Sequence, residues 1–116
     1  MHLRFSLWLS GDMAVLRCAG AMVRGTEIDR LEHTLHNLVV KHSKCVVVIS
    51  DGCSLDAYAI GVFARACAEA KSRGHKLTVV CNEDRLIRLF ELVGLKTELD
   101  IQTNETAAFR ALQTAA

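Results

Sequence analysis

Cys67 and Arg73 are separated by five residues, the spacing with which cysteine phosphatases place a thiolate and a guanidinium around a phosphate. Those enzymes also need a loop whose backbone N–H groups converge on the phosphate. The intervening segment is rich in alanine and contains no glycine, so we expect its N–H groups to donate within a helix. Cys67 also falls on the apolar stripe of that helix. The pattern therefore predicts a buried structural cysteine, and the chain shows no other catalytic motif that would indicate an enzyme.

His33 and His36 stand three positions apart on a predicted helix, with Asp29 and Glu32 beside them. This spacing places both imidazoles on one helix face, where they could ligate a metal ion. The histidines lie opposite a stripe of leucines, however, and the sequence shows no third ligand. A solvent-exposed helix face is therefore the preferred interpretation, and a metal site is the alternative.

Ser54, Asp56 and Tyr58 surround the start of a long alanine-rich helix. The Asp56 carboxylate is suited to cap that helix by accepting backbone N–H groups, a role typically worth about 1 kcal/mol. A second role, compatible with the first, is contact with a partner protein. Tyr58 is either a surface aromatic that lies over the turn or an anchor in a protein interface, and the sequence favours neither.

The strand Cys45–Ile49 must position these residues, because its uninterrupted β-branched run predicts burial on both faces. A turn over Ser50–Leu55 follows, and the helix begins at Asp56 and ends at Gly74. The chain thus passes from strand to turn to helix. This arrangement delivers the residues that start the helix to an exposed turn.

Hydrophobic periodicity divides the rest of the chain into strands and helices. Two opening strands joined by Ser10–Asp12 predict a β-hairpin. Thr26 with Asp29 is similar to a capping box, and Asn82 is the expected N-cap of a helix that ends at Gly94. The other expected bounds are strands Leu3–Leu9, Met13–Ala19, Leu77–Cys81 and Glu98–Gln102, and helices Glu27–Val40 and Thr106–Gln113. The order predicts an α/β fold, a mixed β-sheet with an N-terminal β-hairpin and about four helices packed against it, in a single domain over residues 1–116.

The first strand has one predicted apolar face, formed by Leu3, Phe5, Leu7 and Leu9. Trp8 lies on the other face. Its preferred interpretation is packing against a helix or a subunit partner, with ligand stacking as the alternative. A homodimer is therefore among the possible assemblies.

The stretch that opens the central helix resembles the signature of the STAS domain, the sulfate transporter and anti-sigma factor antagonist module. In that family a buried strand leads to an apolar residue, Asp, Ser, Ser or Thr, Gly, Leu and Gly, and this signature opens the second helix. The corresponding residues here are Leu55, Asp56, Ala57, Tyr58, Ala59, Ile60 and Gly61. A second resemblance is a strand, loop and helix with an apolar-Gly-Leu ending, TVVCNEDRLIRLFELVGL. The resemblance covers nearly the whole chain and implies a STAS-like mixed β-sheet.

The resemblance implies a non-catalytic regulatory module that binds a kinase-type anti-sigma factor through the start of its second helix. Antagonists of the family are phosphorylated by their partner kinase on the serine that corresponds to Ala57, which has no hydroxyl. We therefore expect binding without this phosphoserine switch. Ser54 and Tyr58 carry hydroxyls but do not align with the modified position. The expected partner-binding residues are Ser54, Asp56, Ala57, Tyr58, Gly61 and Arg65.

Two other functions fit the same fold. An accessory STAS subunit of a lipid-transport ABC ATPase would also need no phosphorylatable serine. A domain that senses a small molecule or nucleotide is the third possibility, because some STAS domains of anion transporters and stress sensors bind such ligands. A complex with a kinase-like protein or a transporter ATPase would favour protein binding, whereas a co-purified ligand would favour sensing.

Composition and charge narrow the possible partners. The 116 residues are 51% hydrophobic and 23% charged, which is typical of a folded globular chain. Fourteen basic and thirteen acidic residues leave a net charge of +1, so charge balance implies neither nucleic acid nor an anionic membrane as a partner. No apolar stretch is long enough for a membrane span or a signal peptide, and the five scattered cysteines suit a reducing compartment. We therefore expect a cytoplasmic protein without a metal or other cofactor.

Overall fold

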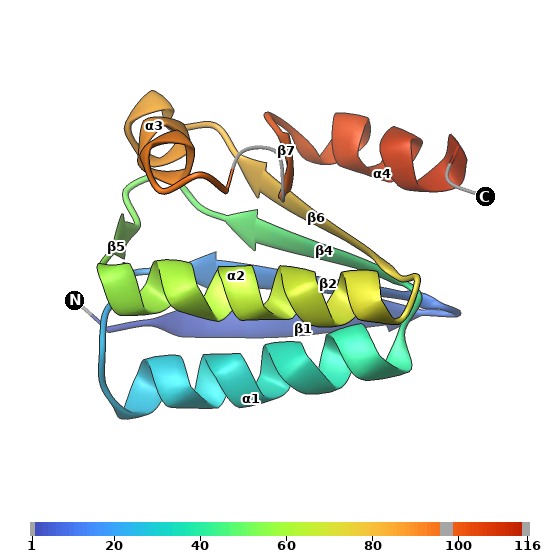
Figure 1. Cartoon of the computed structure of the whole chain (residues 1–116), viewed down its shortest axis with the longest axis horizontal. Helices are drawn as coiled ribbons and strands as arrows, with labels where there is room; N and C mark the ends of the chain where they lie inside the picture. Colours follow the sequence, from blue (N-terminus) through green and yellow to red (C-terminus); the bar gives the residue numbers. More distant parts are fainter. Residues whose placement is uncertain (1, 96–98, 115–116) are drawn as a thin grey trace.

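The computed structural model describes residues 2–95 and 99–114, and Figure 1 shows its elements coloured along the chain. The elements are, in order, β1 (Arg4–Ser10), β2 (Met13–Ala19), β3 (Ala21–Met22), α1 (Thr26–Lys41), β4 (Lys44–Ile49), β5 (Ser54–Leu55), α2 (Ala57–Ser72), β6 (Lys76–Cys81), α3 (Asp84–Leu92), β7 (Asp100–Gln102) and α4 (Glu105–Thr114). The predicted hairpin, mixed sheet and helices are confirmed. The short strands β3 and β5 were not predicted.

The main sheet has the strand order β1-β2-β4-β6-β7, in which β1 is antiparallel to β2 and all other neighbours are parallel. Helices α1 and α2 cover one face of the sheet, and α4 covers the other (Figure 1). Val46 packs with Ala108 and Leu112 of α4, whereas Val47 belongs to the larger core beneath α1 and α2. The predicted burial of the central strand on both faces is confirmed.

A second, two-stranded parallel sheet joins the segments that lead into α1 and α2. Ala21 pairs with Ser54, and Met22 pairs with Leu55. The backbone N–H of Asp56 then donates to the carbonyl oxygen of Met22 at 3.2 Å. Strands of two residues show no hydrophobic period, which is why the sequence predicted a turn rather than a strand at Ser54 and Leu55. The pairing fixes the start of α2 against the segment before α1.

Gly20 makes this close approach of segments possible. Its φ is +103°, a conformation that side chains disfavour. An added Cβ at this position would also overlap the carbonyl oxygen of His2. The glycine therefore lets the N-terminal segment pass directly beside the chain as it turns from β2 into β3.

The predicted glycine ends of α2 and α3 are confirmed. Gly74 and Gly94 have φ values of +69° and +79°. The N–H of Leu95 donates to the carbonyl oxygen of Phe90 at 2.9 Å, the backbone closure expected after a helix that ends in a left-handed glycine. Leu95 also packs against the core.

The capping box predicted for α1 is wrong. Thr26 is the first helical residue, and Gly25 holds the N-cap position without a side-chain cap. The carboxylate of Asp29, which would have completed the box, instead accepts a hydrogen bond from the hydroxyl of Tyr58. A long-range partner therefore replaces the local one.

The N-cap predicted for α3 is also wrong, because Glu83 rather than Asn82 occupies that position. Glu83 has extended backbone angles, and its carbonyl oxygen accepts the N–H of Ile87 at 3.0 Å. The Glu83 carboxylate accepts the N–H of Gly52 in the loop after β4, so it ties that loop to α3.

The apolar face predicted for the first strand is only partly covered. Leu3 is buried, but Leu7 and Leu9 are 45% and 53% exposed, and Trp8 on the other face is 52% exposed. Trp8 is therefore only half covered by its own chain, and its packing against a subunit partner stays a prediction. At the other end of the sheet β7 begins at Asp100, and the predicted strand start at Glu98 lies outside the described residues.

Candidate functional site

The start of α2 is fixed by Asp56, whose two carboxylate oxygens each accept a backbone N–H. One oxygen accepts from Ala59 at 2.9 Å, which is the predicted N-cap. The other accepts from Arg24 at 2.8 Å, in the segment before α1. These hydrogen bonds hold the pKa of the Asp56 carboxyl below its usual range, and the bond from Arg24 has the larger effect. Asp56 therefore caps α2 and also joins the start of α2 to the segment before α1.

Tyr58, in the first turn of α2, contacts α1 through both its hydroxyl and its ring. The hydroxyl donates to Asp29 at 2.9 Å and lies 3.4 Å from the Glu32 carboxylate. The guanidinium carbons of Arg24 and Arg65 each lie 5.8 Å from the ring centroid, within the range of a cation–π contact. The hydrogen bond to Asp29 is the main cause that raises the pKa of Tyr58, because phenolate cannot donate it.

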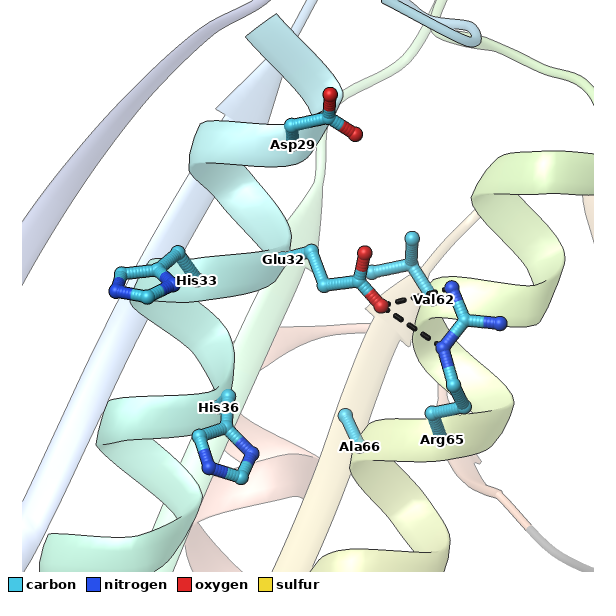
Figure 2. A pocket seen from close by; sticks show the side chains of 7 residues that line it. All are labelled: Asp29, Glu32, His33, His36, Val62, Arg65 and Ala66. Atoms are coloured by element: carbon cyan, nitrogen blue, oxygen red, sulfur yellow. Dashed lines mark hydrogen bonds and ion pairs between the residues drawn. The ribbon is translucent and has the colours of Figure 1, made fainter. Parts of the chain in front are cut away.

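Arg65 lies two turns further along α2 and forms an ion pair with Glu32 of α1 (Figure 2). Its Nε and Nη2 atoms lie 2.8 Å and 2.7 Å from the same carboxylate oxygen. Gly61 provides room for this guanidinium, because a Cβ at Gly61 would lie 3.2 Å from Nη1 of Arg65. The α1–α2 contact thus uses a glycine as well as the charges.

The six predicted site residues lie on one segment, from β5 through the first turns of α2. Ala57 is exposed, whereas Ser54, Asp56, Tyr58 and Gly61 are half-buried. The backbone N–H of Ser54 donates to the carbonyl oxygen of Gly20 at 3.3 Å, so Ser54 belongs to the small sheet. Figure 1 shows the starts of α1 and α2 at the same end of the molecule, with β5 beside the start of α2.

Three residues of the site were missed by the sequence interpretation: Arg24, Asp29 and Glu32. Glu32 was considered only as a companion of the histidines, and Asp29 as that and as the second residue of a capping box. Their spacing of three residues, which places them on one helix face, was the available signal. Arg24 gave no signal, because its backbone N–H is the group that bonds.

A groove of about 340 Å³ runs between α1 and α2 (Figure 2). Nδ1 of His36 lies 3.9 Å from a carboxylate oxygen of Glu69, and His33 is exposed. Within residues 2–95 and 99–114, no group of three or more His, Cys, Asp or Glu side chains is placed to hold a metal ion. The groove is lined by Asp29, Glu32, His33, His36, Val62, Arg65 and Ala66.

The five cysteines are all described, and they are buried and form no disulfide. Burial raises the pKa of the Cys18 thiol to about 12 and that of Cys45 to about 12, which disfavours the reactive thiolate. Cys67 lies inside α2, and Arg73 is the residue at its C-cap. The helical segment between them forms no phosphate loop, as its composition predicted.

The sequence pattern of the STAS domain family matches residues 9–108. The chain belongs to the STAS domain family. This match includes every element from β2 to β7, and with them the capped start of α2. No individually curated protein sequence matches this STAS chain. In residues 2–95 and 99–114, no helix has both the length and the apolar character to cross a bilayer.

Solved structures share the fold of this STAS chain. A putative anti-sigma factor antagonist from Thermotoga maritima is 18% identical, with a TM-score of 0.76 and coverage of 94% of each chain. An anti-sigma factor antagonist from Mycobacterium paratuberculosis is 16% identical, with a TM-score of 0.75 and coverage of 97% of this chain and 95% of that chain. SpoIIAA in its unphosphorylated form is 10% identical, with a TM-score of 0.73 and coverage of 96% and 99%.

Proposed function

We propose that the chain is a non-catalytic regulatory STAS module that binds a protein partner through the start of α2. The observation that carries the proposal is the double hydrogen bond of the Asp56 carboxylate, which fixes the turn that presents exposed Ala57. A surface held rigid before binding loses little conformational entropy on binding. Solved neighbours described as anti-sigma factor antagonists support a regulatory role of this kind.

The proposed partner is a cytoplasmic anti-sigma factor of the ATP-binding serine kinase type, and the proposed surface comprises the six residues predicted from the sequence. Binding through Ala57 would lack the phosphoserine switch, because alanine has no hydroxyl to accept a phosphoryl group. Tyr58 is a poor substitute for the missing serine as a phosphorylation site. A phosphate there would add about −1.5 to −2 charges beside the carboxylates of Asp29 and Glu32.

The groove between α1 and α2 supports protein binding over ligand sensing. Its charged groups already have partners: Arg65 pairs with Glu32, and Asp29 accepts a hydrogen bond from Tyr58 at the start of α2. These bonds hold the two helices together rather than presenting the charges to a ligand. The adjoining first turn of α2, with Ala57 exposed, is the surface that remains for a partner.

Affinity capture from the source cells tests the proposal. The bait is the wild-type chain, with Ala57→Asp as the surface variant and Ala68→Asp as the matched control. Ala68 is also exposed on α2, near the other end of the helix. We expect a serine kinase of the anti-sigma type to be captured by the wild type and the control and lost with Ala57→Asp, because the added carboxylate would be buried in the interface.

Other outcomes distinguish the alternatives. Capture of a transporter ATPase that depends on Ala57 would support the accessory-subunit function instead. Equal capture of the kinase by all three baits would contradict the proposed surface. Incubation of the wild-type chain with the captured kinase and ATP should leave its intact mass unchanged. A phosphate on Ser54 or Tyr58 would refute the proposed absence of a phosphorylation switch.

A further inference from the structure

The outer edge of β1 is the open, apolar edge of the main sheet. Strand order places β1 at the edge, paired only with β2 among the described strands. Leu7, Trp8 and Leu9 are consecutive and are 45%, 52% and 53% exposed. Neighbouring residues of a strand direct their backbone N–H and C=O groups to opposite sides, so half of these groups in β1 point away from β2. The edge therefore offers both backbone hydrogen-bonding groups and apolar side chains.

This edge lacks the features that keep edge strands apart. Monomeric proteins protect such strands with lysines, prolines, bulges or inward-pointing charges. The strand RFSLWLS contains no lysine or proline, and its only charge is Arg4 at one end. Its register with β2 runs without interruption from Arg4 opposite Ala19 to Ser10 opposite Met13, so no bulge bends it. An unprotected edge of seven residues is a template for another strand.

We propose that β1 pairs with β1 of a second copy of this chain, antiparallel and around a two-fold axis at Leu7. This register pairs all seven residues of the strand. It places Leu7 opposite Leu7 of the second copy, and Phe5 opposite Leu9, so apolar side chains meet on the face that α1 covers. The two five-stranded sheets then form one continuous sheet.

Charge complementarity favours a second copy as the occupant. In this register Arg4 lies opposite the neutral Ser10 of the second copy, so no like charges face each other. Asp12 of the second copy lies in the exposed hairpin turn that follows this Ser10, near the end of the Arg4 side chain. The two-fold axis repeats this favourable pair at the other end of the paired strands.

The pairing is independent of the proposed function. Sheet order places β1 two strands away from β4, which leads into α2. A dimer through β1 therefore leaves the exposed turn at Ala57 accessible on each copy. A chain that does not dimerise would leave the partner-capture experiment unaffected. A failed capture would likewise leave the dimer proposal unaffected.

Sedimentation of the full chain over a wide range of protein concentrations tests the dimer. We expect the mass to rise from one chain toward two as concentration increases. Trp8 is the only tryptophan, and it would lie opposite Ser6 of the second copy. Its emission maximum should therefore shift to shorter wavelength over the same range, because the ring leaves water.

Leu7→Lys is the decisive variant, because it would set two ammonium groups directly opposite each other at the two-fold axis. Leu92→Lys is the matched control, since Leu92 is 83% exposed on α3, away from β1. We expect Leu7→Lys to remain monomeric with a native circular dichroism spectrum, and Leu92→Lys to dimerise like the wild type. A wild-type chain that stays monomeric over this concentration range would overturn the proposal. A monomer is the result expected if β1 pairs with a different protein instead.

Chemical crosslinking tests the register itself. In Leu7→Cys the introduced thiols of two copies would meet at the axis, so a short bismaleimide should link them. Leu92→Cys provides the control, and the native cysteines are buried. Equal crosslinking of both variants, or dimers of Leu7→Lys as abundant as those of Leu92→Lys, would place the contact elsewhere and refute the pairing.

Discussion

The hydroxyl of Tyr58 donates a 2.9 Å hydrogen bond to the carboxylate of Asp29, and this bond joins the first turn of α2 to the first turn of α1. The two residues are 29 positions apart in the sequence. Tyr58 is thus a structural contact between helices at the surface proposed for partner binding. Changes at Tyr58 therefore affect stability and binding together unless its hydroxyl and its ring are altered separately.

Tyr58→Phe removes the hydroxyl and keeps the ring between Arg24 and Arg65. We expect a small decrease in Tm at neutral pH, measured by calorimetry. Because the folded pKa of Tyr58 is raised, the stabilising effect of its hydroxyl is present below the unfolded pKa of about 10 and is lost as pH rises through the folded value. The Tm difference between wild type and variant should therefore shrink at strongly alkaline pH. A difference that grows there would contradict the assigned bond.

Tyr58→Ala removes the ring as well as the hydroxyl. If the ring is an interface anchor, this variant should bind the captured partner more weakly than Tyr58→Phe, because only the alanine variant loses apolar contact area. Titration calorimetry with both variants measures the difference. Equal affinities would show that the ring serves the α1–α2 contact alone.

Asp56→Ala should lower the free energy of unfolding by about 1 kcal/mol, the usual effect of a lost N-cap. Asp56→Asn is the matched control, because its amide oxygen still accepts the N–H of Ala59. The folded pKa of Asp56 is lowered, so its stabilising effect is present above the unfolded pKa of about 3.9 and is lost as pH falls through the folded value. Urea unfolding at neutral and acidic pH should show the alanine effect shrinking in acid. An effect of Asp56→Ala that does not change with pH would argue against hydrogen bonds to an ionised Asp56 carboxylate.

Gly61→Ala should raise the stability of the fold while altering the proposed surface. Alanine is favoured over glycine in a helix interior by about 0.5–1 kcal/mol. The new Cβ would crowd only the flexible end of Arg65, which can move. The same substitution in an Arg65→Ala background should stabilise slightly more, since nothing is crowded there. Thermal unfolding measures both changes, and a destabilised Gly61→Ala would show that the Arg65 position is rigid.

Cys18 and Cys45 should resist alkylation in the native protein. Burial raises both pKa values to about 12, so at pH 8 almost no thiolate is present, and the thiols are also covered by the core. Iodoacetamide followed by peptide mass analysis should modify them only after denaturant is added. Rapid modification of either residue without denaturant would be inconsistent with this packing.

The sequence by itself determined the features that depend on neighbours along the chain. The β-branched run of β4 gave its burial on both faces, since side chains of a strand alternate and all of these are apolar. Gly74 and Gly94 set the ends of α2 and α3, because glycine readily adopts positive φ. The cap at Asp56 was predictable for the same local reason, as its N–H partner is three residues away.

Only the tertiary structure decided which distant groups meet at the start of α2. The Arg24 N–H reaches Asp56 across 32 positions, and the Tyr58 hydroxyl captures the Asp29 carboxylate that local spacing had assigned to a capping box. The exposure of Leu7 and Leu9 likewise depends on which elements pack over the edge strand. Hydrophobic periodicity indicates which side of an element is apolar. The partner of each side chain is set by the packing of whole elements, and no local sequence pattern encodes that packing.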